Sequence, residues 1–471
     1  MAEPLVSLQK RAYEQWLLGV DAAQLAEQAT QRFQELVHYQ QSTDSATSAT
    51  VLLAESDPLN FLAGFVAACT ARSPVFLGNP SWASSEWRSV LAIVQPQIIW
   101  GSIANDPEVQ ELVAVRQNIP SPAQQSQPGS ILIPTGGSSG KIRFAIHTWE
   151  TLLASVTGFK TYFQIDRVHS CCVLPLYHVS GLMQFMRSFT SGGKLAIFSA
   201  KIFETKLYTS SKSDQFDFDP SKFFLSLVPT QLHRLLQHPP ASEKLAHFRT
   251  VLLGGAPAWE ELLEQARSAQ IRLAPTYGMT ETASQVVTLK SEDFLKGQRG
   301  CGQVLPHAQI QIQDQAGNPL ASGQIGRITI QSQALALGYY PNYFADLDRF
   351  ATDDLGYFDA QGYLQVVGRS SQKIITGGEN VSPAEVEAAI RATQLVQDVC
   401  VLGIPDAEWG EMVTAVYVPL NRTPIADLQQ ALAPRLSKFK QPKRWIAVDA
   451  IPRSLQGKIN YAQLRDIALR A

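Results

Sequence analysis

The sequence predicts an α/β protein: a large N-terminal domain of βαβ layers with a small β-rich subdomain, followed by a small α+β C-terminal domain. Three observations carry this prediction. Apolar runs of strand length alternate with amphipathic segments through the first half of the chain. From about Gly302, short strands and Gly-rich turns take over, and after Arg369 a compact tail of about a hundred residues follows.

The apolar runs of the first half are short enough for buried strands. They cover residues 51–53, 75–77, 98–100 and 131–133, and later 171–174, 225–228 and 251–253. Between them, residues 60–71 and 87–94 have the apolar periodicity of helices. Strands that alternate with helices favour βαβ units, so we expect a largely parallel sheet.

The second half predicts the β-rich subdomain and then a separate unit. Residues 310–313, 327–330 and 363–367 are the expected strands of the subdomain. In the tail, Ser382 as N-cap, Pro383 in the first turn and Glu385 at N3 predict the start of a helix. We place the domain boundary at residues 370–371, which gives domains 1–369 and 370–471.

Composition excludes several classes of protein. The 471 residues include 39 basic and 41 acidic side chains, so no overall basic field attracts nucleic acid or an anionic membrane. The apolar run 61–69 is much shorter than the roughly 20 residues that span a bilayer, and the first residues lack the pattern of a secretory signal. Five scattered cysteines form no zinc pattern and no disulfide framework, so we expect reduced thiols and a cytoplasmic location.

The strongest motif is a strand that runs into a Gly-rich loop, residues 131–141. Its glycines let backbone N–H groups approach phosphate oxygens, while Thr135, Ser138 and Ser139 add hydroxyl donors and Lys141 adds positive charge. It is not the P-loop of the large NTPase class, because Thr135 stands where that pattern needs glycine and Ile142 where it needs Ser or Thr. The alternative is a flexible Gly/Ser hairpin.

A second motif, residues 275–284, groups an aromatic ring, hydroxyls and a carboxylate around one glycine. A nucleotide with its metal could use Tyr277 for the base, Thr280 for phosphate and Glu281 for Mg²⁺. The alternative is a turn followed by a helix that Thr280 caps.

Three weaker motifs follow the same logic. Asp354 could accept hydrogen bonds from a ribose diol, or simply belong to an Asp-rich turn. The small residues 254–257 end a strand where a flat ring could lie against the backbone. The polar loops at 377–380 and 454–458 complete the set, although a lysine near a chain end, such as Lys458, is usually exposed to solvent.

Taken in order, these stretches resemble the adenylate-forming superfamily of acyl-CoA synthetases, adenylation domains and luciferases, from about Val51 to the end. The resemblance implies a mobile C-terminal lid and a two-step reaction with ATP, Mg²⁺ and coenzyme A. It implies catalytic roles for Thr280, Glu281 (also the metal ligand) and Lys458, and CoA contacts at Gly377 and Gly378. The implied nucleotide-binding residues are Thr135, Gly136, Gly137, Ser138, Ser139, Gly140, Lys141, Gly255, Ala256, Pro257, Thr276, Tyr277, Asp354 and Arg369.

Within the superfamily, residues 174–187 and 280–285 look closest to the o-succinylbenzoate–CoA ligases of menaquinone and phylloquinone synthesis. Their substrate is an aromatic dicarboxylate, so one carboxylate reacts and the other must be recognised. The resemblance implies substrate contacts at His178, Ser180, Arg187, Gly278, Ser284 and Gln285. Arg187 could instead form a surface salt bridge, and His178 could be a core histidine.

Three positions depart from the superfamily pattern. Ile142 replaces a proline after the phosphate loop, Gly136 replaces a common serine, and Ser371 stands where a charged hinge residue is frequent. None removes a group that the chemistry needs. Two other functions stay open: a CoA ligase for another aromatic or aliphatic acid, and a catalytically silent nucleotide-binding homologue. The expected partners are small molecules, and a homo-oligomer is possible.

Overall fold

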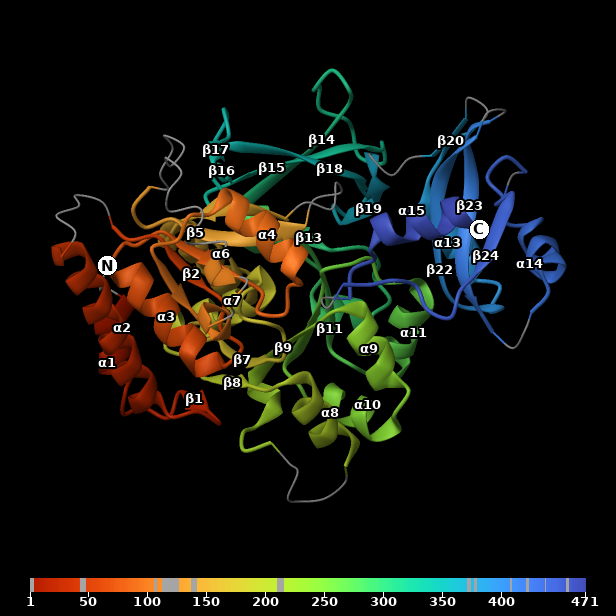
Figure 1. Ribbon diagram of the computed structural model, residues 1–471. Coiled ribbons are helices and arrows are strands. Elements are labelled where there is room, and N and C mark those ends of the chain that lie inside the picture. The colour runs from red at the N-terminus through yellow and green to blue at the C-terminus, as the bar shows by residue number, and fades with distance from the viewer. Residues whose placement is uncertain are drawn as a thin grey trace.

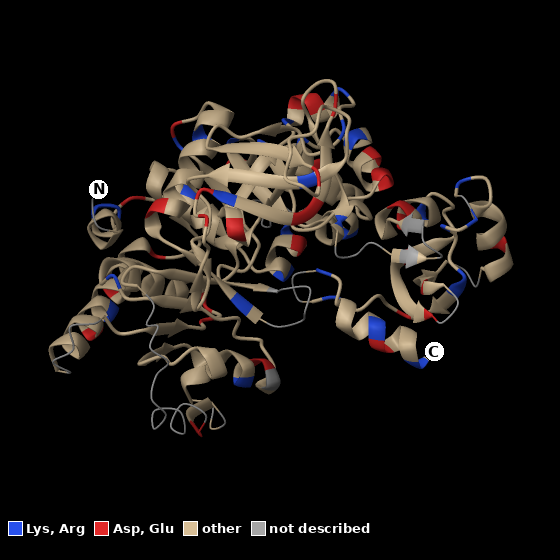
Figure 2. Cartoon of the chain, turned by 90° about the horizontal axis from the view of Figure 1, so that it is seen from above, with Lys and Arg blue, Asp and Glu red and all other residues tan. Residues whose placement is uncertain are grey.

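The protein has two bodies, a large one that begins at the N-terminus and a small one at the C-terminus (Figure 1). The computed structural model describes residues 4–42, 48–105, 107, 109–111, 127–136, 142–209, 216–370, 374–376, 379–406, 409–420, 423–436, 438–454 and 457–471. Along the ribbon, positions with acidic residues and positions with basic residues are interspersed in both bodies (Figure 2).

The first sheet of the large domain is mainly parallel. Its strands, in spatial order, are β1 (Leu17–Leu18), β8 (Leu195–Ile197), β7 (His169–Cys172), β9 (Phe223–Leu227), β10 (Thr250–Leu253), β11 (Leu273–Met279), β12 (Ser284–Thr288) and β13 (Gln303–Val304). The strands from β1 to β11 are parallel, whereas β12 and β13 pair antiparallel. The apolar runs at 225–228 and 251–253 therefore form neighbouring strands, as the sequence predicts.

The second sheet contains the apolar runs that come first in the sequence. Its spatial order is β17 (Asn342–Tyr343), β16 (Gly338–Tyr339), β6 (Ile142–His147), β5 (Ile131–Gly136), β3 (Val75–Leu77), β2 (Val51–Leu53) and β4 (Ile98–Trp100). The four strands β4, β2, β3 and β5 are parallel, and β6 returns antiparallel to β5. The predicted strands 51–53, 75–77 and 98–100 are confirmed.

The helices of the large domain are amphipathic or fully buried. They are α1 (Pro4–Lys10), α2 (Ala22–Ser42), α3 (Pro58–Thr70), α4 (Ser84–Ile93), α6 (Trp149–Phe163), α7 (Val179–Ser191), α8 (Ala200–Tyr208), α9 (Pro229–Leu236), α10 (Pro239–Ala246), α11 (Glu260–Ser268) and α12 (Ser291–Leu295). Asp57 caps α3 by accepting a hydrogen bond from the backbone N–H of Asn60 at 2.9 Å. Residues of α3, α6 and α7 share one hydrophobic core, which fixes these three helices against one another.

The predicted β-rich subdomain is an antiparallel sheet with the order β14 (Ala308–Gln313), β15 (Gly326–Ser332), β18 (Arg349–Phe358) and β19 (Leu364–Arg369). It lies at the top of the large domain in Figure 1. Short 3₁₀ turns, η1 (Ser102–Asn105), η3 (Pro220–Lys222) and η4 (Thr280–Thr282), connect elements elsewhere in this domain.

The small domain is a sheet flanked by helices. Its strands are β20 (Ile374–Thr376), β21 (Glu379–Val381), β22 (Val396–Asp406), β23 (Gly410–Pro419) and β24 (Arg444–Ala447), and its helices are α13 (Pro383–Arg391), α14 (Ile425–Leu432) and α15 (Tyr461–Arg470). Two hydrophobic clusters drawn from residues 374–468 form its own core. Ser382 takes the N-cap position of α13 as predicted, but its hydroxyl makes no capping hydrogen bond. The exact boundary at 370–371 stays a prediction.

No helix in the described ranges combines the length and apolarity needed to cross a bilayer.

The C-terminal end of α7 is held by an arginine from the N-terminal segment. Buried Arg11 donates from Nη1 to the carbonyl of Phe189 at 2.9 Å and from Nη2 to the carbonyl of Gly193 at 2.6 Å. Its guanidinium also lies 4.5 Å from the ring centroid of Trp16. A cation is favourable there because the last carbonyls of a helix carry partial negative charge. Arg11 therefore fixes a helix that carries candidate substrate residues.

We expect Arg11→Ala to lower the free energy of unfolding by about 3 kcal/mol, because buried carbonyls would lose a charged donor. Urea unfolding measures this. Arg299→Ala is the matched control: its side chain is 67% exposed and pairs with Glu260 at the surface, so its loss should cost less than about 1 kcal/mol. Equal unfolding free energies for the two variants would contradict the role given to Arg11.

Candidate active site

The candidate residues gather where strands of the large domain end and the small domain approaches. Residues 254–257 follow the carboxyl end of β10, Tyr277 lies on the neighbouring strand β11, and Glu281 lies in the turn η4 after β11. In parallel sheets this edge is where ligands bind. The arrangement brings together motifs that are far apart in the sequence.

Asp354 is the centre of a hydrogen-bonded group on the subdomain sheet. The hydroxyl of Tyr277 donates to Oδ2 of Asp354 at 2.8 Å, and Nε of Arg369 donates to Oδ1 at 3.1 Å. Asp354 and Arg369 face each other across the strands β18 and β19. Burial, followed by the charge of Asp354, raises the pKa of Tyr277, so its hydroxyl stays protonated. Each carboxylate oxygen retains a lone pair for a further donor, such as a ribose hydroxyl.

The backbone after β10 carries the small residues against which we expect a flat ring to lie. Thr276 donates from Oγ1 to the carbonyl of Leu253 at 3.1 Å, which fixes the neighbouring strand end. A Cβ at Gly254 would lie 2.5 Å from that Oγ1, and Gly255 has φ +83°, which favours glycine. Glycine at both positions therefore follows from close packing and backbone geometry.

Glu281 is held by Tyr339, a residue that the sequence motifs did not include. The hydroxyl of Tyr339 donates to Oε1 of Glu281 at 2.6 Å, and the guanidinium of Arg143 lies 4.0 Å from the centroid of the Tyr339 ring. Burial and the charge of Glu281 raise the pKa of Tyr339, so this hydroxyl remains a donor. No sequence signal reveals Tyr339, because it lies 58 residues from its partner on a different sheet.

His147 is another residue that the motifs missed. It ends β6 and is fully buried, and its Nε2 lies 2.7 Å from the carbonyl oxygen of Thr280. Since a carbonyl only accepts, the proton is on Nε2. Burial lowers the pKa of His147 to about 4, so the ring is neutral at pH 7. This bond positions the backbone at Thr280 and Glu281. The alternative in which Thr280 caps a helix is wrong, because a 3₁₀ turn follows Met279 instead.

Lys458 lies on a loop of the small domain that faces the large domain. A short antiparallel bridge joins Arg453 to Ile459, and the N–H of Ser454 donates to the carbonyl of Lys458 at 2.7 Å. A Cβ on the adjacent Gly457 would lie 2.7 Å from Oγ1 of Thr230, so this loop packs against α9 of the large domain.

The electrostatic surroundings of Lys458 place it beside the candidate site. The side chain keeps access to solvent, yet the protein atoms around it partly desolvate the ammonium and lower its pKa. Arg369 lowers that pKa further, whereas Glu281 raises it. The lysine, the carboxylate and the arginine are therefore within electrostatic reach of one another. Lys458 is exposed to solvent, as the alternative expects, but it is not remote from the candidate site.

Arg187 is a buried cation without an anionic partner in the described part of the chain. Only 2% of it is exposed, and Nη2 donates to Oγ of Ser284 at 3.1 Å and to Oε1 of Gln285 at 3.3 Å. Its guanidinium lies 4.3 Å from the ring centroid of Phe159. Burial lowers the pKa of Arg187 to about 9, so it stays charged at pH 7. The alternative of a surface salt bridge is wrong for this residue.

Ser284 and Gln285 are held in place by the turn between β11 and β12. Ser284 has φ +89°, a strained value for a residue with a side chain. A Cβ at Gly278 would lie 2.2 Å from the carbonyl oxygen of Ser284, so glycine is required for this close approach. Gln285 donates from Nε2 to Oγ1 of Thr288 at 2.8 Å, which turns its Oε1 toward Arg187.

His178 stands at the start of α7, the helix that carries Arg187, and the charge of Lys458 acts on it. It is the N-cap residue of α7, is 8% exposed and packs edge-on against Tyr177. Burial and the charge of Lys458 lower the pKa of His178 to about 3. Ser180 lies in the first turn of α7, where its carbonyl accepts from Nε2 of Gln184 at 3.0 Å. His178 is therefore within electrostatic range of Lys458, and its substrate role stays a prediction, whereas no contact among the described residues fixes a role for the Ser180 hydroxyl.

Several predicted site residues lie outside the described ranges: Gly137, Ser138, Ser139, Gly140 and Lys141 of the phosphate loop, Gly377 and Gly378 of the CoA loop, and Ser371. The start of the phosphate loop is described. Thr135 faces Arg143 across β5 and β6, and Gly136 faces Ile142. Among the other predicted residues, hydrogen bonds join Asp354 to Tyr277 and Arg369, and Arg187 to Ser284 and Gln285.

The site fits a magnesium ion held by one carboxylate. Mg²⁺ is commonly bound by one or two carboxylates together with substrate phosphates and waters. Among the described residues, no group of three or more His, Cys, Asp or Glu could hold a metal by itself. Tyr339 occupies one oxygen of Glu281, and no described residue donates to the other. Glu281 can therefore serve as the protein ligand of a phosphate-bound ion.

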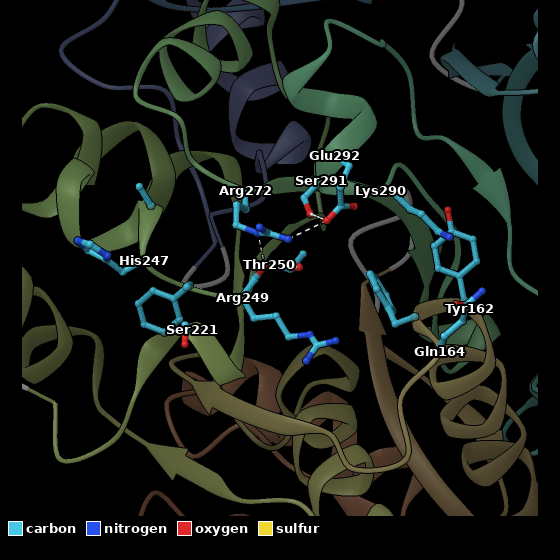
Figure 3. Close-up of a pocket in the computed structure, with 13 residues that line it drawn as sticks. Tyr162, Gln164, Ser221, His247, Arg249, Thr250, Arg272, Lys290, Ser291 and Glu292 are labelled. Carbon is cyan, nitrogen blue, oxygen red and sulfur yellow. Dashed lines mark hydrogen bonds and ion pairs between the residues drawn. The ribbon is translucent and has the colours of Figure 1, made fainter.

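A separate cavity of 540 Å³ lies at the opposite edge of the first sheet, near the amino ends of β10 and β11. Figure 3 shows Arg272 there, paired with Glu292 at 2.7 Å and donating to the carbonyl of Arg249 at 2.8 Å. None of the predicted site residues lines this cavity. It is distinct from the candidate active site.

Comparison with known proteins identifies the fold and the family. Residues 47–340 match the AMP-binding enzyme family, and residues 385–458 match the AMP-binding enzyme C-terminal domain. The chain is 32% identical over 349 residues to a 2-succinylbenzoate–CoA ligase of Enterococcus faecalis, which covers 73% of this chain and 70% of the relative. A ligase of the same name from Bacillus velezensis is 30% identical over 403 residues, covering 84% and 78%.

Solved structures share the whole architecture. The o-succinylbenzoate CoA synthetase of Bacillus subtilis, in complex with its acyl-adenylate intermediate, superposes with a TM-score of 0.83 over 99% of this chain and 98% of that one, at 23% identity. ATP-bound MatB from Rhodopseudomonas palustris gives a TM-score of 0.81 at 23% identity over 98% of each chain. At this identity the likeness shows the fold, a large N-terminal and a small C-terminal domain.

The buried His147 makes stability depend on pH. Its pKa of about 4 in the folded chain lies below the unfolded value of 6.5, so as pH falls protons bind the unfolded chain first. We expect roughly 3 kcal/mol of stability to be lost between pH 7 and pH 4 through this residue. His147→Gln keeps an N–H for the Thr280 carbonyl but cannot titrate. Urea unfolding at several pH values should give a shallower loss for the variant, and parallel curves would refute the assignment.

Proposed function

Because this chain belongs to the AMP-binding enzyme family, we propose that it activates a carboxylic acid with ATP as an acyl-adenylate and then transfers the acyl group to the thiol of coenzyme A. The observation that carries the proposal is the packing of the Lys458 loop against α9 of the large domain, which brings the ammonium within electrostatic range of Glu281 and Arg369. These groups suit a nucleotide whose α-phosphorus is attacked by a carboxylate.

In the first half-reaction, an oxygen of the substrate carboxylate attacks the α-phosphorus, and the bond to the β-phosphate breaks to release pyrophosphate. Both reactants are anionic, so the transition state needs positive charge that is already in place. Lys458 supplies an ammonium there, and Asp354 orients the nucleotide through the ribose hydroxyls. A Mg²⁺ held by Glu281 and phosphate oxygens would neutralise further charge.

In the second half-reaction, the CoA sulfur attacks the acyl carbon, AMP leaves with the bonding electron pair, and the thiol proton passes to solvent. Lys458 occupies the cleft that the thiol must approach, so its loop has to withdraw first. We propose that the small domain pivots at residues 370–371 and that Gly377 and Gly378 then line the CoA path. One site can serve both steps through such a lid movement.

The acid is proposed to be 2-succinylbenzoate, which places the enzyme in menaquinone or phylloquinone biosynthesis. Arg187 supports this choice, since a buried guanidinium without a carboxylate of its own is expensive unless a ligand supplies one. An acid with a second carboxylate fits that requirement. The names of the Enterococcus faecalis and Bacillus velezensis relatives point to the same acid.

The free cysteines of the described chain fit a reducing compartment. We propose the cytoplasm, where ATP and CoA are available as substrates.

The proposal is tested by the release of AMP with a panel of acids: 2-succinylbenzoate, benzoate and medium-chain fatty acids, each with ATP, Mg²⁺ and CoA. We expect 2-succinylbenzoate to give the highest kcat/KM. A higher kcat/KM with a monocarboxylate would favour the alternative of another acyl-CoA ligase. ATP binding without acid-dependent pyrophosphate exchange would favour a silent homologue.

Lys458→Ala should lower the rate of acid-dependent ATP–pyrophosphate exchange by about 10²- to 10³-fold, because charge at the α-phosphorus would lose its ammonium partner. Its unfolding midpoint should match that of the wild type. The control is Lys438→Ala, which removes an exposed lysine from the same domain and should leave exchange intact. Undiminished exchange by the Lys458 variant would remove the central residue of the mechanism.

Arg187→Met should raise the KM for 2-succinylbenzoate by about 100-fold, through loss of a charge-assisted contact, while the KM for ATP stays unchanged. Because a buried unpaired cation is also removed, the variant should be at least as stable as the wild type. Steady-state kinetics and urea unfolding measure both effects. Arg234→Met, at a side chain 53% exposed, serves as the control, and an unaltered KM in the Arg187 variant would argue against a dicarboxylate substrate.

A further inference from the structure

His307 is a residue that neither the motifs nor the proposed mechanism uses. It lies between β13 and β14, where its carbonyl accepts from Oγ of Ser332 at 2.7 Å. Both ring nitrogens are buried and have no hydrogen-bond partner among the described residues. A buried polar group without a partner destabilises the folded state. Such a group in a folded protein calls for an explanation, and a ligand that supplies the missing partner is one.

His307 and Arg187 contact one turn of α6 at two consecutive residues, and the charge of Arg187 acts on the imidazole. At Gly158, an added Cβ would lie 1.8 Å from Nδ1 of His307, so the imidazole packs directly on the helix backbone. At Phe159, the ring lies 4.3 Å from the guanidinium carbon of Arg187. Neighbouring positions of one helix therefore hold the imidazole and the guanidinium.

The electrostatic effect of one group on the other agrees with this placement. Burial is the main cause that lowers the pKa of His307 to about 4, and the charge of Arg187 is the second. At neutral pH the imidazole thus carries a proton on one nitrogen and acts as one donor and one acceptor. Since Nδ1 lies against Gly158, Nε2 is the nitrogen left for a ligand.

His307 and Arg187 both offer hydrogen-bond donors, and no described anion accepts from them. Nε of Arg187 is also buried without a partner, and no described Asp or Glu forms an ion pair with this arginine. A carboxylate could accept hydrogen bonds from the unused Nε–H of Arg187 and from an N–H of the His307 imidazole. The charge of the guanidinium would strengthen the first of these bonds.

We propose that His307 is a specificity-determining residue whose Nε2–H donates to the carboxylate of the acid that does not react, beside Arg187. This assignment rests on the proposed function, since it requires an acid with two carboxylates. It makes Gly158 part of the same pocket, because any larger residue there would displace the imidazole. A pocket built around buried donors discriminates strongly against an analogue that lacks the acceptor.

The test compares two acids in two variants. 3-Benzoylpropionate has the ring and the reacting chain of 2-succinylbenzoate but no ring carboxylate. His307→Phe keeps a ring of similar size and removes the donor, whereas His307→Gln keeps an N–H near the position of Nε2. The readouts are kcat and KM for AMP release, with ATP affinity and far-ultraviolet circular dichroism as checks on folding.

For His307→Phe we expect the KM for 2-succinylbenzoate to rise about 10- to 100-fold, since a hydrogen bond to a charged group is lost. The kcat for that acid and both constants for 3-benzoylpropionate should stay near the wild-type values. His307→Gln should recover most of the affinity for 2-succinylbenzoate.

Equal losses with both acids in His307→Phe would show a structural role, and an unchanged KM for 2-succinylbenzoate would show no contact; either result overturns the assignment while the proposed function stands. A wild-type enzyme that activates monocarboxylates but not 2-succinylbenzoate would overturn the substrate proposal and this assignment together.

Discussion

The described residues of the candidate site include more cations than carboxylates, and this imbalance organises the rest of the site. Lys458, Arg369 and Arg187 belong to it, and among the described residues Asp354 alone pairs directly with one of them, Arg369. Cations held in a partly desolvated site strengthen their attraction to anions and need no reorganisation when charge develops. The site is therefore complementary to a triphosphate and a carboxylate together, which repel each other in water.

Keeping such groups in place requires support from residues that touch no substrate. His147 fixes the backbone at Thr280, and Tyr339 fixes the carboxylate of Glu281. Behind the acid pocket, Thr288 orients Gln285, and Arg11 holds the end of the helix that carries Arg187. The strained backbone at Ser284 is stabilised by the same packing. These contacts explain why a buried, unpaired guanidinium can persist in a stable fold.

Sequence patterns predicted the architecture because it depends on local signals. The strand 51–53 and the buried helix near 60–71 are encoded in the order of apolar residues and in the cap at Asp57. The glycines that shape loops, such as Gly255, were recognisable for the same reason. The motifs also named Tyr277 and Asp354, which lie far apart in the sequence and are joined by a hydrogen bond in the fold.

Contacts between distant segments left no such signal. The pairing of Tyr339 with Glu281 depends on how two sheets meet, and the place of His307 depends on a missing Cβ at Gly158. The same holds for the helix end bound by Arg11, 177 residues away from its first carbonyl partner. Even Ser382, correctly placed at a helix start, does not use its hydroxyl as a cap.

The central claim is that a carboxylate oxygen attacks the α-phosphorus, and oxygen-isotope transfer tests it most directly. 2-Succinylbenzoate labelled with ¹⁸O in both carboxylates would be turned over with ATP, Mg²⁺ and CoA, and the AMP and pyrophosphate examined by mass spectrometry. Attack at the α-phosphorus leaves one ¹⁸O in AMP and none in pyrophosphate. AMP without label, or label found in pyrophosphate or phosphate, would contradict the account.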